Sequence, residues 1–368
     1  MKAILLGAGK QGKAIAYALV KLGYNDLIIV DWLDDNLIEI KTFLSNKFSN
    51  INIKIIKDGI TGLNEKDYEN VEFVISGLPY ISNFEYAEIF LNKKIPWYDL
   101  GGNVTCSEEI ESLAITKKCK VFTDIGLAPG FIGCLALHLI KKIPPQEKIN
   151  SVNMYCGGLP IRKDVNKLGY IQTFSLDGLI NEYFDTPIAL VNGQITEIEP
   201  FGDLENNPDL GFPYEAFNTS GGITRKFLNI LTKNNILNAC YKTIRYRGHH
   251  DIISFMKDDL ELSDFDLRWC INKSCKKSKQ SGDFTVCVVI IKTDKEKYGI
   301  RVSCRWNKEF TAMQMSTGFI AAIIAHLTKN INKIILSEED VDYENLMGIY
   351  EPMVEELCQD NQNNEDKS

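Results

Sequence analysis

Three glycines near the start of the chain have the spacing of a phosphate-binding turn. They stand at positions 7, 9 and 12 in the stretch AILLGAGKQG, directly after a short apolar run. Gly7 permits a tight turn after a strand, Gly9 lets the backbone approach a pyrophosphate, and Gly12 lets the following helix pack closely on the strand. A helix that begins at Lys10 and Gln11 would point its N-terminal N–H groups at the same anion. The sequence therefore predicts a dinucleotide site rather than a plain turn.

An acidic residue supports this prediction and selects the nucleotide. Asp31 ends the next apolar run, LIIVD, 19 residues after Gly12. In this position a carboxylate accepts hydrogen bonds from a ribose 2′-hydroxyl and repels a 2′-phosphate. The predicted cofactor is accordingly NAD, with NADP less favoured. Further cofactor contacts are predicted near the ends of later strands, at Asp58, Gly77, Leu78, Pro79 and Gly101.

Other side chains at predicted strand ends could move protons. Asp124 ends a strand at the edge of the sheet where ligands bind in folds of this kind. It could accept a proton, hold an ammonium group or simply cap the following turn. Asp99 has the same alternatives, and Tyr80 follows an earlier strand where it could line the cleft. Asp124 and Tyr80 are the candidate catalytic residues of this part of the chain.

A second group of candidates lies in the segment IRYRGHH. Arg245 and Arg247 are two residues apart and so share one face of a strand, where they could bind an anion or form surface ion pairs. His249 follows them, and an imidazole that titrates near neutral pH suits proton transfer, a structural role being the alternative. We predict that Arg245 binds a substrate carboxylate, with Arg247 beside it, and that His249 takes part in catalysis.

The elements that would position these residues alternate between strand and helix in the first third of the chain. Short β-branched runs at 3–7, 27–31, 51–56, 73–77, 97–101 and 120–126 are separated by helical or loop segments. This alternation is typical of a doubly wound parallel sheet, the Rossmann fold. Beyond residue 130 come an amphipathic helix and longer alternating strands, at 151–160, 241–248, 284–293 and 298–306. The predicted fold class is α/β, with a second α+β domain that carries a largely antiparallel sheet.

The predicted domain boundaries follow from this change of pattern. Residues 1–130 form the dinucleotide-binding domain together with about 310–345, because the helical run at 311–330 has small residues spaced for close packing. Residues 131–309 form the substrate-binding and dimerisation domain. Residues 346–368 form an acidic C-terminal segment, whose last stretch, QDNQNNEDKS, is expected to be disordered.

Seven further stretches, spread over nearly the whole chain, carry a resemblance to a known family. They read DLGG (99–102), DIGLAPG (124–130), CGGLPIR (156–162), FSLDGLINEY (174–183), EAFNTSGG (215–222), KTIRYRGH (242–249) and TAM (311–313). In this order they resemble the saccharopine dehydrogenase-like family, most closely its lysine 6-dehydrogenase branch. The resemblance implies a Rossmann domain, a central α+β domain and a homodimer formed through the central sheet.

The central domain supplies the remaining substrate candidates. The resemblance places Cys156 near the substrate, and the following Gly157 suggests a close approach of the backbone, to substrate or to another strand. Thr219, Ser220 and Thr243 are candidate hydrogen-bonding walls of the same site.

The chemistry implied by the resemblance is NAD(P)-linked oxidation of a C–N bond in an amino acid. In lysine 6-dehydrogenases the ε-carbon of lysine gives up hydride, and the imine hydrolyses to a semialdehyde that cyclises to a piperideine carboxylate. Saccharopine dehydrogenases oxidise, or form in reverse, a secondary amine that joins two amino acids. They typically carry an aspartate where this chain has Ala128 and tend to have an arginine near 218–220, so both differences favour the lysine branch. The region 264–280 does not resemble the helical segment expected of that branch.

Three functions are compatible with these residues. The leading hypothesis is oxidation of the ε-amine of L-lysine. The alternative enzyme is a saccharopine or carboxynorspermidine dehydrogenase-type reductive amination. The alternative of another class is an NAD-binding regulatory protein without turnover.

Composition narrows the partners and the location. The chain has 368 residues, of which 45% are hydrophobic, and no apolar run is long enough to span a bilayer. Because the first strand follows Met1 almost directly, we expect no leader peptide and a cytoplasmic location. The ten cysteines form no CxxC pair and the four histidines are scattered, which predicts no metal site. The basic run KSCKKSK at 273–279 lacks aromatic residues, so nucleic acid is not an expected partner. The expected partners are a small amino-acid or polyamine-like substrate and a second copy of the chain.

Overall fold

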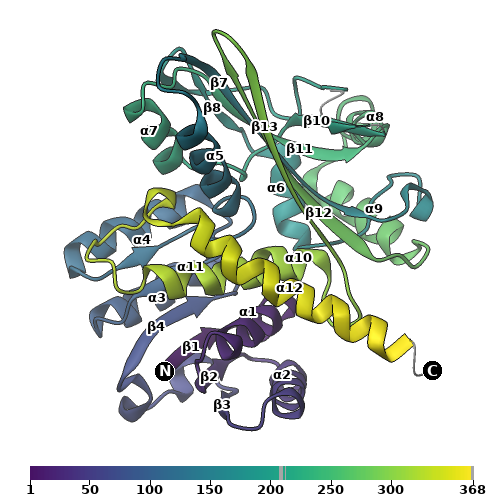
Figure 1. The fold of residues 1–368 in the computed structure, drawn as a ribbon. Coiled ribbons are helices and arrows are strands. Elements are labelled where there is room, and N and C mark those ends of the chain that lie inside the picture. Colours follow the sequence, from purple (N-terminus) through teal and green to yellow (C-terminus); the bar gives the residue numbers. More distant parts are fainter. Residues whose placement is uncertain (207–209, 212, 366–368) are drawn as a thin grey trace. The chain divides into compact units, whose positions relative to one another are not determined.

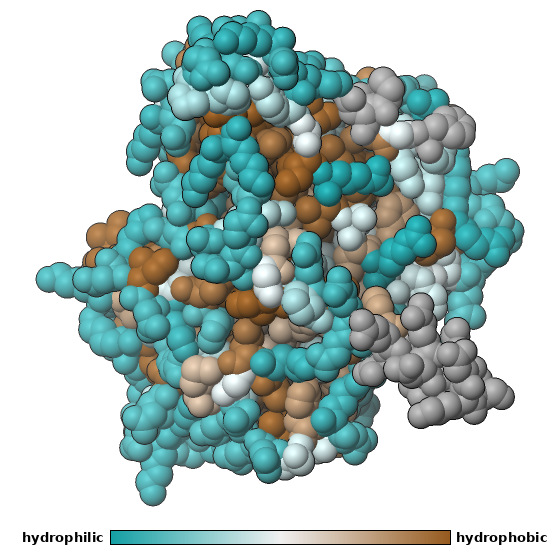
Figure 2. All heavy atoms as spheres, in the orientation of Figure 1, coloured by the Kyte–Doolittle hydropathy of each residue, from teal (hydrophilic) through white to brown (hydrophobic). Residues whose placement is uncertain are grey.

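A computed structural model shows the chain as two compact units (Figure 1). It describes residues 1–206, 210–211 and 213–365, with the backbone alone for 359–365. Unit 1 comprises Met1–Phe131 and Gln314–Ser368, and unit 2 comprises Ile132–Met313. The face drawn in Figure 2 is covered mainly by hydrophilic residues, with hydrophobic ones between them. Among the described residues, no helix combines the length and the apolarity that crossing a bilayer requires.

Unit 1 is built on a six-stranded sheet in which every neighbouring pair is parallel. Its strands are β1 (Lys2–Leu6), β2 (Asp26–Val30), β3 (Asn52–Ile56), β4 (Val71–Ser76), β5 (Trp97–Asp99) and β6 (Val121–Phe122). Their order is β3-β2-β1-β4-β5-β6, the doubly wound order that reverses between β1 and β4. Ligands of such sheets bind outside the carboxyl ends of the strands at this reversal, which we call the switch point.

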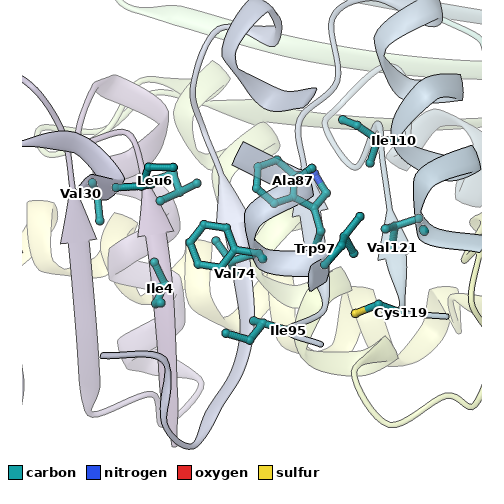
Figure 3. Packing of buried hydrophobic residues seen from close by; sticks show 14 of the residues in the cluster. Ile4, Leu6, Val30, Val74, Ala87, Ile95, Trp97, Ile110, Cys119 and Val121 are labelled. Atoms are coloured by element: carbon teal, nitrogen blue, oxygen red, sulfur yellow. The ribbon is translucent and has the colours of Figure 1, made fainter. Parts of the chain in front are cut away.

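Helices cover both faces of this sheet. The elements between the strands are α1 (Lys10–Lys21), α2 (Asp34–Lys47), η1 (Gly59–Gly62), η2 (Glu65–Tyr68), η3 (Tyr80–Ser82), α3 (Asn83–Asn92) and α4 (Val104–Lys117). Right-handed crossovers place α1 and α2 on one face and α3 and α4 on the other. One core cluster packs strand side chains such as Ile4, Val74 and Trp97 against Ala87 of α3 and Ile110 of α4 (Figure 3). Burial on both faces explains why the strands are almost wholly apolar.

The C-terminal part of the chain completes unit 1. Its elements are α10 (Ala312–Gln314), the π-helical turn η7 (Met315–Phe319), α11 (Ile320–Thr328), η8 (Glu338–Asp340) and α12 (Tyr343–Glu365). Gly318 lies against α1, because a Cβ there would be 2.6 Å from the Cβ of Ala14. The Val121 N–H donates to the Ile334 carbonyl (2.8 Å), and the Leu336 N–H donates to the Val121 carbonyl (2.9 Å). Residues 334–336 therefore hydrogen-bond along the edge strand β6.

The end of the chain differs from the prediction in part. The backbone of residues 359–365 continues α12, although this stretch was expected to be disordered. Helix α12 is anchored by buried residues such as Leu346, Met353 and Leu357, and a helix once nucleated extends easily through polar residues. Residues 366–368, on which the same prediction falls, lie outside the described residues.

Unit 2 is built on a seven-stranded mixed sheet. Its strands are β7 (Ile149–Pro160), β8 (Ile188–Val191), β9 (Gln194–Glu197), β10 (Tyr214–Asn218), β11 (Ala239–Tyr246), β12 (Asp283–Thr293) and β13 (Lys297–Arg305). The order is β13-β12-β7-β11-β8-β9, with β10 beside β11. Only the pair β7–β11 is parallel among the described pairs. The predicted fold class, a Rossmann sheet with a second domain that carries a largely antiparallel sheet, is confirmed.

The helices of unit 2 bury much of this sheet. They are α5 (Phe131–Lys142), η4 (Lys163–Val165), α6 (Leu176–Phe184), α7 (Arg225–Lys233), α8 (His249–Ser254), the π-helical turn η6 (Phe255–Asp259) and α9 (Asp264–Lys276). Leu179 of α6, Ile253 of α8 and Leu267 of α9 share one core cluster with Phe217 of β10. This core holds the elements that follow the segment IRYRGHH (244–250), which we call the arginine segment.

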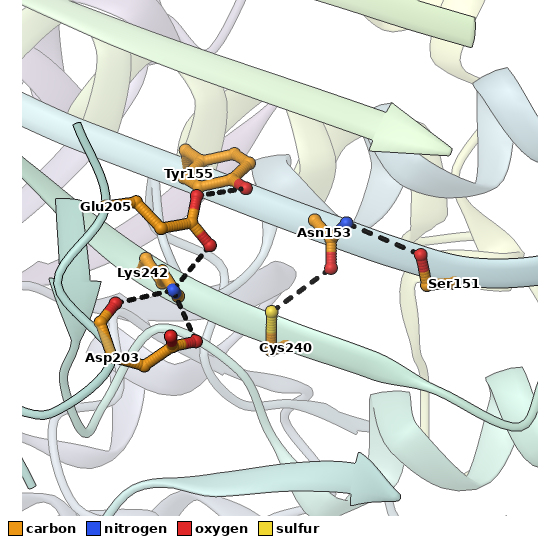
Figure 4. Close-up of polar contacts among 7 residues, drawn as sticks. All are labelled: Ser151, Asn153, Tyr155, Asp203, Glu205, Cys240 and Lys242. Atoms are coloured by element: carbon orange, nitrogen blue, oxygen red, sulfur yellow. Dashed lines mark hydrogen bonds and ion pairs between the residues drawn. The ribbon is translucent and has the colours of Figure 1, made fainter. Parts of the chain in front are cut away.

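A buried lysine joins a loop to the sheet of unit 2. Lys242 of β11 is fully buried, and its Nζ donates to the Asp203 carboxylate, the Asp203 carbonyl and the Glu205 carboxylate, each at 2.6 Å (Figure 4). The Tyr155 hydroxyl donates to the other Glu205 oxygen (3.0 Å). The charge of Lys242 is therefore compensated inside the unit, and the contact has a structural role.

Candidate functional site

The glycine loop closes over the ends of β1 and β4. Gly7 has a φ of 91°, and its N–H donates to the Val30 carbonyl (2.8 Å). A Cβ at Gly7 would lie 3.1 Å from the carbonyl carbon of Gly77, and one at Gly12 would lie 1.9 Å from the Gly7 carbonyl oxygen. A Cβ at Gly9, in contrast, would meet nothing within 4 Å. The fold therefore requires glycine at positions 7 and 12, whereas Gly9 leaves open space.

The N-terminus of α1 opens onto this space. Gly9 is the N-cap residue, no side chain caps the helix, and both Gly9 and Lys10 are exposed. The side-chain amide of Gln314 donates to the Lys10 carbonyl (2.8 Å) and holds the first turn in place, while Gln11 is half-buried. A helix N-terminus of this kind attracts an anion through its N–H groups and its dipole.

Asp31 reaches the glycine loop from the end of β2. Its Oδ2 accepts a hydrogen bond from the Ala8 N–H (2.5 Å), and its Oδ1 accepts one from the Leu33 N–H (2.8 Å). Each carboxylate oxygen has a second acceptor site. The two bonds therefore fix the carboxylate beside the loop and leave it able to accept from ribose hydroxyls.

An aromatic side chain that the sequence analysis missed stands next to Asp31. The Trp32 side chain is 61% exposed, and its ring atoms lie 2.6–3.1 Å from where a Cβ of Gly59 would be. Only a residue without a side chain lets the indole lie there. An exposed indole beside the carboxylate that is predicted to bind a ribose offers a stacking face for a purine ring. Asp58, the predicted adenine or ribose contact, directly precedes Gly59 and is exposed.

The end of β4 follows the same edge of the sheet. The Gly77 N–H donates to the last carbonyl of β1 (2.8 Å), so the two strands stay paired up to the switch point. Leu78 is half-buried and Pro79 is exposed. Tyr80 begins η3, and its ring lies 3.3 Å from where a Cβ of Gly102 would be. The structure therefore places these four predicted residues at the switch point.

Two aspartates meet at the ends of β5 and β6. The Asp99 Oδ2 accepts from the Trp97 indole N–H (2.6 Å), and its Oδ1 accepts from the Gly101 N–H (2.7 Å) and from the Asp124 N–H (3.4 Å). Asp124 has a left-handed φ of 66°, and its Oδ1 lies 1.9 Å from where a Cβ of Gly101 would be. Burial, and then the charge of Asp124, raise the pKa of Asp99 to about 7. Gly101, predicted as a cofactor contact, thus touches both acids.

Arg245 in unit 2 is turned inward, which does not support its predicted role. It is 1% exposed, its Nη2 donates to Glu182 Oε2 (2.7 Å), and its guanidinium lies 5.1 Å from the centre of the Tyr170 ring. Burial alone would lower the pKa of Arg245, but the charge of Glu182 keeps that pKa above its usual value. Because Glu182 already balances the charge, the contacts are those of a buried ion pair rather than of a carboxylate receptor.

The prediction that Arg247 shares a strand face with Arg245 is wrong. Strand β11 ends at Tyr246, and Arg247 lies in the turn before α8. Its Nε donates to the Tyr214 carbonyl (3.3 Å), and its own carbonyl accepts from Lys163 (2.7 Å). The alternation of side chains stops where the strand stops, so the two arginines point to different surroundings.

His249 has the contacts of a core histidine rather than of a proton carrier. It is 1% exposed, with Nδ1 3.0 Å from the Leu168 carbonyl and Nε2 2.8 Å from the Tyr183 hydroxyl. Because a carbonyl only accepts, Nδ1 carries the hydrogen and Nε2 accepts from the tyrosine. Burial, and then the charge of Arg245, lower the pKa of His249 to about 3. The ring is therefore neutral near pH 7, with both nitrogens engaged.

Cys156 and Gly157 of β7 contact neighbouring strands. The Cys156 Sγ lies 3.6 Å from the Sγ of Cys287 on β12, and both side chains are buried. A Cβ at Gly157 would lie 2.8 Å from the carbonyl oxygen of Ile244 on β11. Of the two alternatives for Gly157, the structure shows the close approach of another strand.

The three hydroxyl candidates also have partners inside unit 2. Thr219 and Thr243 share a hydrogen bond (2.7 Å), and the Ser220 hydroxyl donates to the Asn181 carbonyl (2.8 Å). Thr243 is level with Cys156 in the pairing of β11 with β7. Thr243 thus contacts Thr219 through its hydroxyl and lies opposite Cys156 in the sheet.

The unit 1 site fits a dinucleotide. Open space at Gly9 before a helix N-terminus suits a diphosphate, the fixed Asp31 carboxylate suits a ribose, and the exposed Trp32 suits a purine. Among the described residues, no group of three or more histidine, cysteine or acidic side chains is arranged to hold a metal ion. Fold and site together define a Rossmann-type dinucleotide-binding unit joined to an α+β unit.

Comparison with known proteins gives the family. The model of the saccharopine dehydrogenase C-terminal domain matches residues 126–361, and the chain therefore belongs to that family. The resemblance to the saccharopine dehydrogenase-like family is confirmed, and its lysine 6-dehydrogenase branch stays a prediction.

Two individual proteins illustrate how far the similarity extends. Mitochondrial alpha-aminoadipic semialdehyde synthase of Rattus norvegicus is 25% identical over 186 residues, which is 49% of this chain and 20% of that relative. The match thus spans one fifth of the relative's length. The apo histidine-tagged saccharopine dehydrogenase (L-Glu forming) from Saccharomyces cerevisiae has a similar structure, with a TM-score of 0.67 at 15% identity. That match covers 94% of this chain and 96% of the yeast chain, and at this identity it shows the fold alone.

Proposed function

We propose that the protein is an NAD-dependent oxidoreductase that oxidises a C–N bond of an amino acid. One observation carries the proposal: buried carboxyl groups stand at strand ends of the same sheet edge that carries the glycine loop. Family membership supports the oxidoreductase class. A hydride acceptor and a proton acceptor are the two groups that such an oxidation needs.

The preference for NAD rests on the charges around the ribose position. Asp31 would accept from the 2′-hydroxyl and repel a 2′-phosphate. Lys57, near the end of β3, forms an ion pair with Asp34, so its charge is compensated within the chain. These groups favour NAD over NADP.

Different residues of unit 1 would bind the cofactor and accept the proton in this reaction. Bound NAD would supply the carbon that accepts hydride, and the glycine loop, Asp31 and Trp32 would hold it. Hydride leaves readily only from a carbon whose nitrogen has a free lone pair, so a substrate ammonium must first lose a proton. Asp124, at the end of β6, is the proposed acceptor, with Tyr80 beside the same site.

The leading substrate is the ε-amine of L-lysine, which would give the semialdehyde and then a piperideine carboxylate. Ala128 supports it, because the aspartate typical of saccharopine dehydrogenases is missing there. The second candidate is a secondary amine of the saccharopine or carboxynorspermidine type, which the family match favours. The third is NAD binding without turnover. It is favoured because Arg245 is paired with Glu182 and His249 with Tyr183, both inside unit 2.

One anaerobic experiment separates these candidates. NAD is added with lysine, saccharopine or carboxynorspermidine, and formation of reduced nicotinamide is followed by absorbance, while calorimetry measures NAD binding. Reduction with lysine alone supports the leading substrate, and reduction only with a secondary amine supports the second. Binding without reduction supports the third, and no binding of NAD or NADP contradicts the whole proposal. Sedimentation of the same samples tests the proposed homodimer.

A further inference from the structure

Helix α9 of unit 2 carries large apolar side chains on its exposed face as well as on its buried one (Figure 1). Leu267 and Ile271 are buried and belong to the core cluster that contains Phe217. Phe265 is 72% exposed, and Trp269, about one helical turn further along, is 57% exposed. Residues four apart lie on the same side of a helix, so the two aromatic side chains form one exposed row. The buried residues fix α9 in unit 2 and leave this row facing the solvent.

The segment before α9 adds to the exposed apolar surface. Phe255 is 53% exposed and Leu260 is 52% exposed, and the Leu260 N–H donates to the Phe255 carbonyl (3.0 Å). In the part of the chain that the structure describes, no other stretch of fifteen residues has four exposed large apolar side chains. A single apolar residue on a surface needs no explanation, whereas a group of them is typical of a contact surface.

The charges on the two sides of the aromatic row have opposite signs. The exposed charged residues in the stretch 258–266 are all acidic, namely Asp258, Asp259, Glu261, Asp264 and Asp266. The exposed charged residues in the stretch 270–280, at 273, 276, 277 and 279, are all lysines. Acids at the start of a helix and bases at its end stabilise the helix dipole, but this effect does not explain the aromatic row between them.

A second copy of α9 that runs in the opposite direction would match these groups. A two-fold axis at Trp269 places this residue against its own copy, with the acidic stretch of each helix facing the lysines of the other. Glu261 and Lys277 lie eight residues before and eight residues after Trp269, so the axis brings them opposite each other. The Lys273 ammonium lies 4.2 Å from the centre of the Trp269 ring, beside the same axis. The surface is therefore complementary to itself in charge and apolar at its centre.

We propose that two copies of the chain associate through α9, antiparallel to each other, with Trp269 at the two-fold axis. The inference rests on the homodimer of the proposed function and assigns its contact to α9 rather than to the central sheet. It does not depend on the redox chemistry proposed for unit 1. One helix face and the segment before it make a small interface, so we expect a dimer that dissociates at micromolar concentrations.

Sedimentation of the full chain at concentrations from about 1 to about 100 μM tests the association. Trp269→Glu should raise the dissociation constant of the dimer by about a hundredfold or more, because two carboxylates then replace two indoles at the axis. Ile115→Glu is the matched control, since Ile115 is 58% exposed on α4 of unit 1. An unmodified protein that is monomeric throughout, or a Trp269→Glu protein that still dimerises as before, overturns the proposal.

A charge exchange tests the antiparallel arrangement without touching the aromatic row. Glu261→Lys and Lys277→Glu should each raise the dissociation constant by about threefold to tenfold, because like charges then face each other. The double variant should return close to the unmodified value. Within one copy these residues lie beyond opposite ends of α9, which is about 20 Å long, so only contact between copies restores the affinity. A double variant no tighter than the single ones contradicts the arrangement.

Calorimetry with NAD separates this inference from the proposed function. The α9 variants should bind NAD as the unmodified protein does, because the glycine loop, Asp31 and Trp32 belong to unit 1. Loss of the dimer with NAD binding retained supports the α9 contact. A protein that dimerises through α9 but binds neither NAD nor NADP would refute the proposed function and leave this contact standing.

Discussion

The glycine loop of unit 1 and the arginine segment of unit 2 both carry groups that bind anions, but only the loop leaves them open. At the loop the groups are backbone amides before α1, and a Cβ at Gly9 would meet nothing. In the arginine segment Arg245 is paired with Glu182, 63 residues away in the chain. A site made of main chain is specified by a few consecutive residues, whereas the role of a charged side chain depends on which partner the fold brings to it.

Breaking the ion pair of unit 2 should have the largest effect. Arg245→Met leaves the Glu182 carboxylate without its cation, which should lower the free energy of unfolding by about 3–5 kcal/mol. Urea titration measures this loss. Combining Arg245→Met with Glu182→Gln should recover much of it, because no uncompensated charge then remains. An unchanged stability together with a raised KM for an anionic substrate would restore Arg245 as a substrate residue.

Two glycine variants in the loop separate the residue needed for folding from the residue needed for ligand binding. Gly12→Ala places a methyl group 1.9 Å from the Gly7 carbonyl oxygen and should cost about 1–3 kcal/mol of stability through overpacking. Gly9→Ala should leave stability within about 0.5 kcal/mol. Because its methyl group enters the space proposed for the diphosphate, Gly9→Ala should still weaken NAD binding by about tenfold or more. Thermal unfolding and calorimetry on both variants make the comparison, and a stable Gly12→Ala protein would contradict it.

Replacing Asp31, the carboxylate predicted to bind the ribose, should alter the preference between NAD and NADP. Asp31→Ser removes the acceptor for the 2′-hydroxyl and the charge that repels a 2′-phosphate. We expect NAD binding to weaken by about tenfold, the equivalent of about 1.4 kcal/mol, and NADP binding to weaken less or to improve. The ratio of the two dissociation constants is the measurement. Equal losses for NAD and NADP would remove the basis for preferring NAD.

The buried histidine of unit 2 should make the smallest, pH-dependent contribution. Its pKa is about 3 when folded and about 6.5 when unfolded, so the unfolded state binds more protons between these values and stability falls as pH falls. Between about pH 7.5 and about pH 6 this linkage costs about 0.8 kcal/mol. His249→Gln should lose that part of the pH dependence, measured by urea titrations at both pH values. An identical pH dependence in the variant would show that His249 is not held neutral.

The sequence predicts the strands of unit 1 well because their signal is local. Apolar runs that are buried on both faces end within a few residues of the observed boundaries, as for β2 and β4. The short strands β8 and β9 were missed because neither shows a long alternating pattern. The π-helical turn η7 was missed for another reason, since helical spacing alone does not reveal it.

The candidate site likewise contains residues that local sequence patterns predict and residues that they do not. The loop glycines and Asp31 could be predicted, because spacing along one β-α-β segment determines their place. Trp32 was readable as an aromatic residue directly after the acid, but its significance depends on Gly59 from another strand end. The internal partners of Arg245 and His249 come from α6 and from residues near 170, and no local pattern in the arginine segment reports them.

The division of unit 1 into two stretches of chain has a consequence for the order in which the protein is made. Residues 314–336 supply the turn against α1 and the hydrogen bonds along β6. A growing chain therefore has the sheet of unit 1 partly uncovered until residues 314–336 are made, while unit 2 is formed by the uninterrupted residues 132–313. The inserted unit can mature during translation, and the nucleotide-binding unit is completed only after residues 314–336 have been made.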